Sequence, residues 1–151
     1  MNGDGLADLI IGAYASDPAA GASAGRSYVV FGKTGTSAVD LSAITEGQGG
    51  FAINGQCSDD QSGTAVSSAG DVNGDGFGDI IIGSPGSGTS GKGSGSAYVV
   101  FGQAGGFGAS LSLSALDGTN GFTIQSNSGY YGTGPLSSVS AAGDVNGDGF
   151  A

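Results

Sequence analysis

Short apolar runs, bounded by glycine, serine and aspartate, follow one another along the chain. The four clearest runs lie at residues 64–69, 78–83, 96–101 and 121–125. Such runs, rich in β-branched and aromatic side chains, predict strands. The second and third are almost continuously apolar, which is typical of strands buried on both faces where sheets stack. No stretch shows a helical period, and the LSAI and LSAL segments predict either a short turn of helix or a loop.

The whole pattern occurs twice, about 70 residues apart. The string NGDG occurs at residues 2–5, 73–76 and 146–149. Other segments keep the same register: GLADLIIG (5–12) with GFGDIIIG (76–83), SYVVFG (27–32) with AYVVFG (97–102), LSAI (41–44) with LSAL (113–116), and GFAI (50–53) with GFTI (121–124). Four short strands at a fixed long period predict the blades of a β-propeller.

The predicted fold is therefore all-β, with propeller blades of four antiparallel strands and two blades per chain. Residues 1–63 form a first blade without its opening strand, and residues 64–135 form the second blade. Residues 136–151 supply a spare opening strand, from Leu136 to Ala142, and a partial loop for a neighbouring blade.

Composition narrows the functions that this chain can have. Thirteen acidic residues against three basic ones give a formal charge of −10, which excludes a basic footprint for nucleic acid and argues against binding to anionic membranes. The chain has no histidine, the commonest general base and a common zinc ligand. Cys57 is the only cysteine, so no internal disulfide forms. No run reaches the roughly 18 apolar residues of a membrane helix, and nothing resembles a signal peptide.

The loop that contains the second NGDG string carries the candidate chemistry. Asp71, Asn73 and Asp75 alternate along it, Gly76 permits a sharp turn, and Asp79 follows. Calcium takes six to eight oxygen ligands from carboxylates and carbonyls on such bent loops. We expect the backbone carbonyl of Phe77 to join these ligands, with the Phe77 side chain free to enter the core.

The residues of this loop also suit two other interpretations. Asn-Gly and Asp-Gly also form ordinary hairpin turns without a metal, but a hairpin does not need oxygen side chains at alternate positions. An EF-hand begins in the same way, yet it needs a glutamate at position twelve. That position is Ile82, inside a predicted strand. The pattern favours a strand–loop–strand calcium site.

The segment GDVNGDGFGDIIIGSPG, followed by GSAYVVFG, resembles the FG-GAP repeat of integrin α-subunit β-propellers and their bacterial relatives. The resemblance covers essentially the whole chain. It implies four-stranded blades in which the loop between the first two strands binds Ca²⁺. The ligands that it implies for the intact loop are Asp71, Asn73, Asp75, the Phe77 carbonyl and Asp79.

The two terminal copies of the loop match this ligand pattern only in part. The first copy has Asn2, Asp4, Leu6 and Asp8 but no leading aspartate, and the last has Asp144, Asn146, Asp148 and Phe150 but no final one. We expect the spare strand of one chain to join the first blade of another. A ring of three or four identical chains, with six or eight blades, would then complete the terminal sites. The alternative is a fragment of a longer propeller whose ends have no designed relation.

These features predict a calcium-stabilised structural and interaction module with no catalysis. The resemblance to the FG-GAP repeat implies a role of the adhesion type, in an extracellular or cell-surface protein. Its partners would be copies of itself and a protein or glycan ligand, without nucleic acid or membrane insertion. The alternative is a carbohydrate-binding propeller, for which Tyr130 and Tyr131 are the candidate sugar-stacking residues. Asp59 and Asp60 are either a second cation contact or solvated turn residues. An enzyme ranks last, because no nucleophile–base pair is evident.

Overall fold

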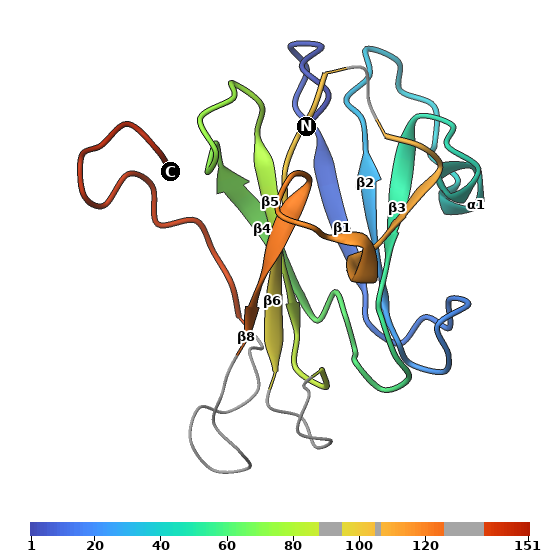
Figure 1. The fold of residues 1–151 in the computed structure, drawn as a ribbon. Helices are drawn as coiled ribbons and strands as arrows, with labels where there is room; N and C mark the ends of the chain where they lie inside the picture. Colours follow the sequence, from blue (N-terminus) through green and yellow to red (C-terminus); the bar gives the residue numbers. More distant parts are fainter. Residues whose placement is uncertain (88–94, 105–106, 126–137) are drawn as a thin grey trace.

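A computed structural model describes residues 1–87, 95–104, 107–125 and 138–151. The fold is mostly β and contains two four-stranded sheets that stand side by side (Figure 1). Sheet 1 has the order β1-β2-β3-β7, with strands Leu9–Ala13, Arg26–Val30, Gly50–Asn54 and Ser110–Ser112. Sheet 2 has the order β4-β5-β6-β8, with strands Ala65–Gly70, Asp79–Ser84, Ser96–Val100 and Gly121–Gln125. Two sheets of this kind are consistent with two propeller blades.

Sheet 2 follows the prediction closely, because all its neighbouring strands pair antiparallel. Sheet 1 departs from it, because β7 pairs parallel with β3. The three strands predicted for the first blade pair antiparallel, and the fourth strand of sheet 1, the parallel β7, is an addition that the sequence did not predict. The physical reason is that β7 comes from the connection between β6 and β8 and crosses back to the outer edge of sheet 1. A chain that returns from a neighbouring sheet is not bound by the direction of a hairpin.

The LSAI and LSAL segments both form short helices next to these edges. Helix α1 spans Leu41–Thr45, and the 3₁₀ helix η1 spans Leu113–Ala115. A side-chain oxygen of Asp40 accepts from Ser42 N and caps α1, and Ser112 plays the same part for η1. Among the described residues, no helix has the length and apolar character needed to cross a membrane.

The core lies between the two sheets. Sheet 1 contributes Val29, Phe51 and Ile53, whose side chains are completely buried, and Phe107 stacks on Phe51 with ring centroids 4.1 Å apart. Sheet 2 contributes four buried residues to the same cluster: Ile80, Ile82, Tyr98 and Val100. Burial of such side chains removes apolar surface from water and supplies the main driving force that holds the sheets together.

The described part of the predicted spare strand, residues 138–142, has no regular secondary structure. It runs alongside sheet 2 without joining it (red in Figure 1). Leu136 lies outside the described residues. The inner edge of sheet 1, along β1, has no pairing strand among the described residues.

Candidate metal centre

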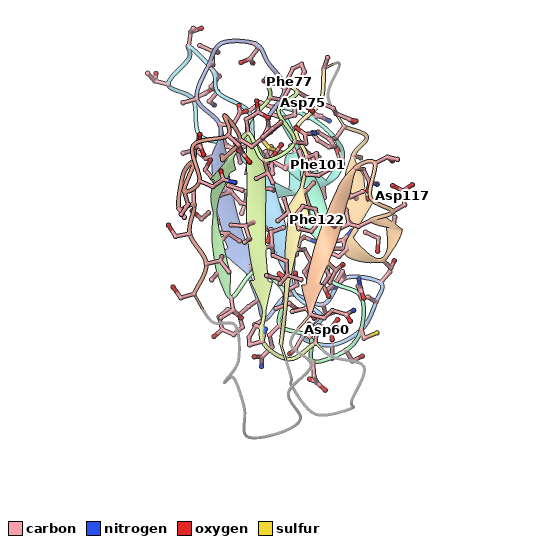
Figure 2. The ribbon with its side chains drawn as sticks, turned by 60° about the vertical axis from the view of Figure 1, so that its left-hand side comes forward. Asp60, Asp75, Phe77, Phe101, Asp117 and Phe122 are labelled. Atoms are coloured by element: carbon pink, nitrogen blue, oxygen red, sulfur yellow. The ribbon has the colours of Figure 1, made fainter. Side chains whose placement is uncertain are left out.

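Three loops carry the repeated NGDG string: a first loop (residues 2–8), a central loop (71–79) and a third loop (144–150). The central loop joins β4 to β5, where the resemblance places the calcium loop. Figure 2 shows Asp75 and Phe77 at one end of the sheets and Asp60 at the opposite end. The candidate ligands of the central loop therefore lie at the end of the sheets away from Asp60.

The central loop is wrapped around the oxygens of its own side chains. The two oxygens of Asp71 accept from the backbone N–H groups of Asp75 and Gly76, at 3.0 and 2.9 Å. Asn73 Oδ1 accepts from Asp75 N at 3.1 Å, and Asp75 Oδ1 accepts from Phe77 N at 2.8 Å. Positive φ angles at Gly74 and Gly76 make these turns possible. The alternate oxygen side chains thus organise the backbone of the loop.

Asp79 closes the loop from the first residue of β5. Its side chain is almost completely buried, and its two oxygens accept from Val72 N and Gly102 N, both at 2.8 Å. Burial raises the pKa of Asp79; these two hydrogen bonds act against that, while the nearby charges of Asp75 and Asp71 raise the pKa further. The carboxyl of Asp79 thus lies buried at the base of the loop, within the electrostatic reach of Asp71 and Asp75.

The third loop repeats the central network at equivalent positions. Asp144 accepts from Asp148 N and Gly149 N, Asn146 Oδ1 accepts from Asp148 N, and Asp148 accepts from Phe150 N. The Gly149 hydrogen bond lowers the pKa of Asp144, and the Phe150 hydrogen bond does the same for Asp148. The geometry of the loop is therefore a property of the sequence motif.

The first loop keeps the same turns and anchors. Asn2 Oδ1 accepts from Asp4 N, and Asp4 Oδ1 accepts from Leu6 N, a hydrogen bond that lowers the pKa of Asp4. Asp8 accepts from Gly32 N at 3.0 Å, as Asp79 accepts from Gly102 N. The Met1 ammonium lies 3.0 Å from Asp8 Oδ2, in the position that Val72 N takes in the central loop.

Successive loops also touch through an aromatic ring. A Cβ added at Gly3 would overlap the ring of Phe77, and one at Gly74 would overlap the ring of Phe150. The ring of each loop therefore lies on the glycine of the loop before it. The expectation that the Phe77 side chain is free to enter the core is not met, because this glycine, which has no side chain, receives the ring between the loops.

The donor set fits calcium in its chemistry. Carboxylate, carboxamide and carbonyl oxygens are the ligands that Ca²⁺ takes, and an ionised carboxylate has about four lone-pair positions. The hydrogen bonds within the loop occupy only part of that capacity. In the described part of the chain, no three acidic side chains converge as a ready-made metal cluster. Asp71, Asp75 and Asp79 are the acidic residues that would hold an ion in the central loop.

The other candidates have different surroundings. Asp60 is buried and accepts from Cys57 N at 2.9 Å, while its backbone carbonyl accepts from Ser84 Oγ. It is thus neither a solvated turn residue nor a member of an acidic cluster in the described structure. Asp59 is exposed with a positive φ, and Cys57 is an exposed free thiol. Tyr130 and Tyr131 lie outside the described residues.

Comparison with known families decides what the repeats are. The model of the FG-GAP repeat matches residues 1–30 and 62–100. The chain carries two FG-GAP repeats. The first FG-GAP match contains the first loop, β1 and β2, and the second contains β4, the central loop, β5 and β6. No curated protein matches the chain.

FG-GAP repeats are usually non-catalytic and often bind Ca²⁺, and they suggest an integrin-like propeller module. The sequence pattern located the oxygen side chains of each FG-GAP loop. It missed the backbone donors that hold the last aspartate, such as Gly102, because they come from another strand end. It also missed the contact between a phenylalanine and the glycine of the preceding loop, because the two residues belong to different copies of the motif.

Proposed function

We propose that this protein is a calcium-stabilised β-propeller module that acts by binding other molecules, in adhesion outside the cell or at its surface, and not by catalysis. The observation that carries the proposal is the central loop, where three carboxylates and Asn73 Oδ1 lie on one bend of chain with the buried Asp79 at its base. The FG-GAP match supports the same assignment.

Calcium would act here as a structural ion. Without a cation, the loop places the negative charges of Asp71 and Asp75 beside the buried carboxylate of Asp79. A divalent ion offsets this repulsion and joins the end of β4 to the start of β5. Extracellular calcium is plentiful, so a fold that depends on this ion suits an extracellular setting.

Titration of chelator-treated protein with Ca²⁺, followed by calorimetry, tests the proposal. We expect at least one site per chain, and we expect Mg²⁺ to bind more weakly because it demands a tight octahedral shell. Asp79→Asn should remove the central site, whereas Asp117→Asn, in an exposed turn outside the three loops, should leave it unchanged. Absence of binding heat at millimolar Ca²⁺ would refute the calcium assignment.

A further inference from the structure

Equivalent residues of the two repeats differ sharply in exposure. Leu9 of β1 is 63% exposed, whereas its equivalent in β5, Ile80, is 4% exposed. Phe122 of β8 is 38% exposed, whereas its equivalent in β3, Phe51, is fully buried. The two repeats therefore have apolar side chains at equivalent positions, but each of these side chains is covered in one sheet and exposed in the other.

Leu9 and Phe122 belong to two different outer faces, whose other members range from exposed to buried, with Val30 at 6% and Val99 at 3% exposure. On sheet 1, Leu9, Ile11, Tyr28 and Val30 share the face that points away from sheet 2, as the strand register requires. On sheet 2, Ile81, Val99, Phe122 and Ile124 share the face that points away from sheet 1. By repeat equivalence, the outer face of sheet 1 corresponds to the face that sheet 2 turns toward the core. The outer face of sheet 2 corresponds to the face that sheet 1 turns toward the core. The two outer faces are thus the two halves of a contact that the chain already makes internally.

A hollow marks the place for this contact. It has a volume of about 450 Å³ and lies between the outer face of sheet 2 and residues 140–151. Phe122 and Ile124 line one side of it, and Ala141 and Val145 line the other. Within the chain, the corresponding space between β4 and sheet 1 is occupied by β5, which contributes Ile80 and Ile82 to the core. By repeat equivalence with β5, the strand that would fill the hollow is a β1 strand.

The outer edge of sheet 2 is open in a matching way. In sheet 1, β3 pairs at its outer edge with β7, with Ile53 opposite Leu111. The equivalent strand β8 has no such neighbour among the described residues, and its Ile124 is exposed. Helices η1 and α1 occupy equivalent places in the two repeats, so the residues just before α1 are the counterpart of β7. These are residues 38–40, which include the exposed Val39. A free edge and a free segment are therefore present on the same molecule.

We infer that a second copy of this chain docks with the outer face of its sheet 1 on the outer face of sheet 2. Residues 138–143 of the first copy then pair with β1 of the second, and residues 38–40 of the second pair with β8 of the first. Because the contact joins two different faces, it is heterologous, and it closes into a ring when the rotation between successive copies divides a full turn evenly. With two blades per chain, three or four copies would give six or eight blades.

The internal pairing gives the register of the new one. β4 pairs with β5 so that Ser68 lies opposite Ile80 and Val66 opposite Ile82. Transferred by repeat equivalence, Ala141 of one copy lies opposite Leu9 of the next, and Val139 lies opposite Ile11. Both Leu9 and Ile11 are exposed in the single chain, and both would become covered.

One segment must move for the copies to join. Residues 145–151 of one copy and residues 1–7 of the next are equivalent in the repeat, so they cannot both occupy the same place. The third loop is held on the central loop, because Ala151 N donates to the carbonyl of Asp71 and Phe150 covers Gly74. Residues 1–7 of the incoming copy would therefore leave, and the open Gly147 would receive the incoming Phe77 in place of Gly3.

Cysteine cross-linking tests the register directly. In a Cys57→Ser background, a Leu9→Cys chain is mixed with an isotope-labelled Ala141→Cys chain and oxidised. We expect the mixed disulfide to form readily. The matched control replaces Leu9→Cys by Ala13→Cys, which lies four residues along β1, about 13 Å away. Because a disulfide needs Cα atoms within about 7 Å, the control pair should not cross-link. Equal cross-linking of both pairs would overturn the proposal.

Native mass spectrometry tests the face. The unmodified chain should give a mass several times its own 14.2 kDa at tens of micromolar concentration. Leu9→Asp should return it to a single chain, and Leu9→Ile should not. Because Leu9 is exposed in the single chain, the aspartate does not disturb its core. A wild-type mass of one chain would overturn the proposal and leave the outer faces to another occupant.

This inference rests on the two sheets being propeller blades and does not require calcium. The same spectra count bound ions, so the two proposals fail separately. Ions on a single chain would leave the calcium assignment standing without the docking, and an oligomer free of ions would do the reverse.

Discussion

The calcium contribution to stability can be isolated by removing one ligand, and Asp75→Ala is the sharpest choice. Asp75 is exposed and accepts from Phe77 N and from Asn73 Nδ2, both at 2.8 Å. Loss of these local hydrogen bonds costs about 0.5–1.5 kcal/mol each at most, because water can replace the partner. Loss of an ion held only by the folded state costs more.

The size of the ion's contribution follows from linkage. At free calcium 100 times above the dissociation constant, one site adds about 2.7 kcal/mol to the free energy of unfolding. For a chain of this length, about 1 kcal/mol shifts the melting temperature by roughly 2–4 °C. Calcium should therefore raise the melting temperature of the wild type by about 5–11 °C, and Asp75→Ala should lose most of that rise.

Asp117→Ala is the matched control for this experiment. Asp117 is also exposed and accepts from both the backbone N and the hydroxyl of Thr119, at 2.9 and 2.6 Å, but it lies outside the three loops. Thermal unfolding of each variant is compared in chelator and in calcium. In chelator Asp75→Ala should lose no more stability than Asp117→Ala, because it also removes one of the charges that repel Asp79. In calcium only Asp75→Ala should fall behind. An equal calcium-induced rise in Asp75→Ala and wild type would refute the reasoning.

Two further predictions concern the core and the buried carboxyl of Asp60. Ile82→Ala should cost about 2–5 kcal/mol of unfolding free energy, because Ile82 is fully buried. The equivalent Ile11→Ala should cost clearly less in dilute solution, because Ile11 is 39% exposed. Urea titrations measure both costs, and equal costs would contradict this prediction. Burial raises the pKa of Asp60 above its ordinary 3.8, so its contribution to stability is present below that value and lost as pH rises through the folded-state pKa. Asp60→Asn, which still offers an acceptor to Cys57 N, should therefore gain stability relative to wild type between pH 3.5 and 7 in chelator, and a constant difference across that range would count against it.

Much of sheet 2 could be predicted from the sequence, because its strands are apolar runs bounded by glycine and they repeat in register. The predicted range 121–125 is β8 without any change of bounds, and the predicted 96–101 differs from β6 by one residue. β7 could not be predicted in the same way. Its three residues, Ser-Leu-Ser, carry no strand pattern, and they pair because β3 presents a free edge beside them.

The candidate site was predictable in its ligands and less so in its surroundings. The alternation of oxygen side chains at Asp71, Asn73 and Asp75 follows from the spacing alone. The hydrogen bond from Gly102 N to Asp79 depends on how β6 ends beside β5, which is a tertiary relation. The exposure of these side chains could not be predicted from the sequence either. Phe51 and Phe122 stand in nearly identical local sequences and differ only in whether another sheet covers them.

The ring that lies on the preceding loop has a consequence for how ions would be taken up. Phe77 reaches from the central loop to Gly3, and Phe150 reaches from the third loop to Gly74. A cation that fixes one loop also fixes the ring that rests on its neighbour, so part of the ordering cost of the next site is already met. Coupling of this kind is reciprocal between sites. Ion uptake by the successive loops would then be cooperative, with a saturation curve steeper than that of independent sites.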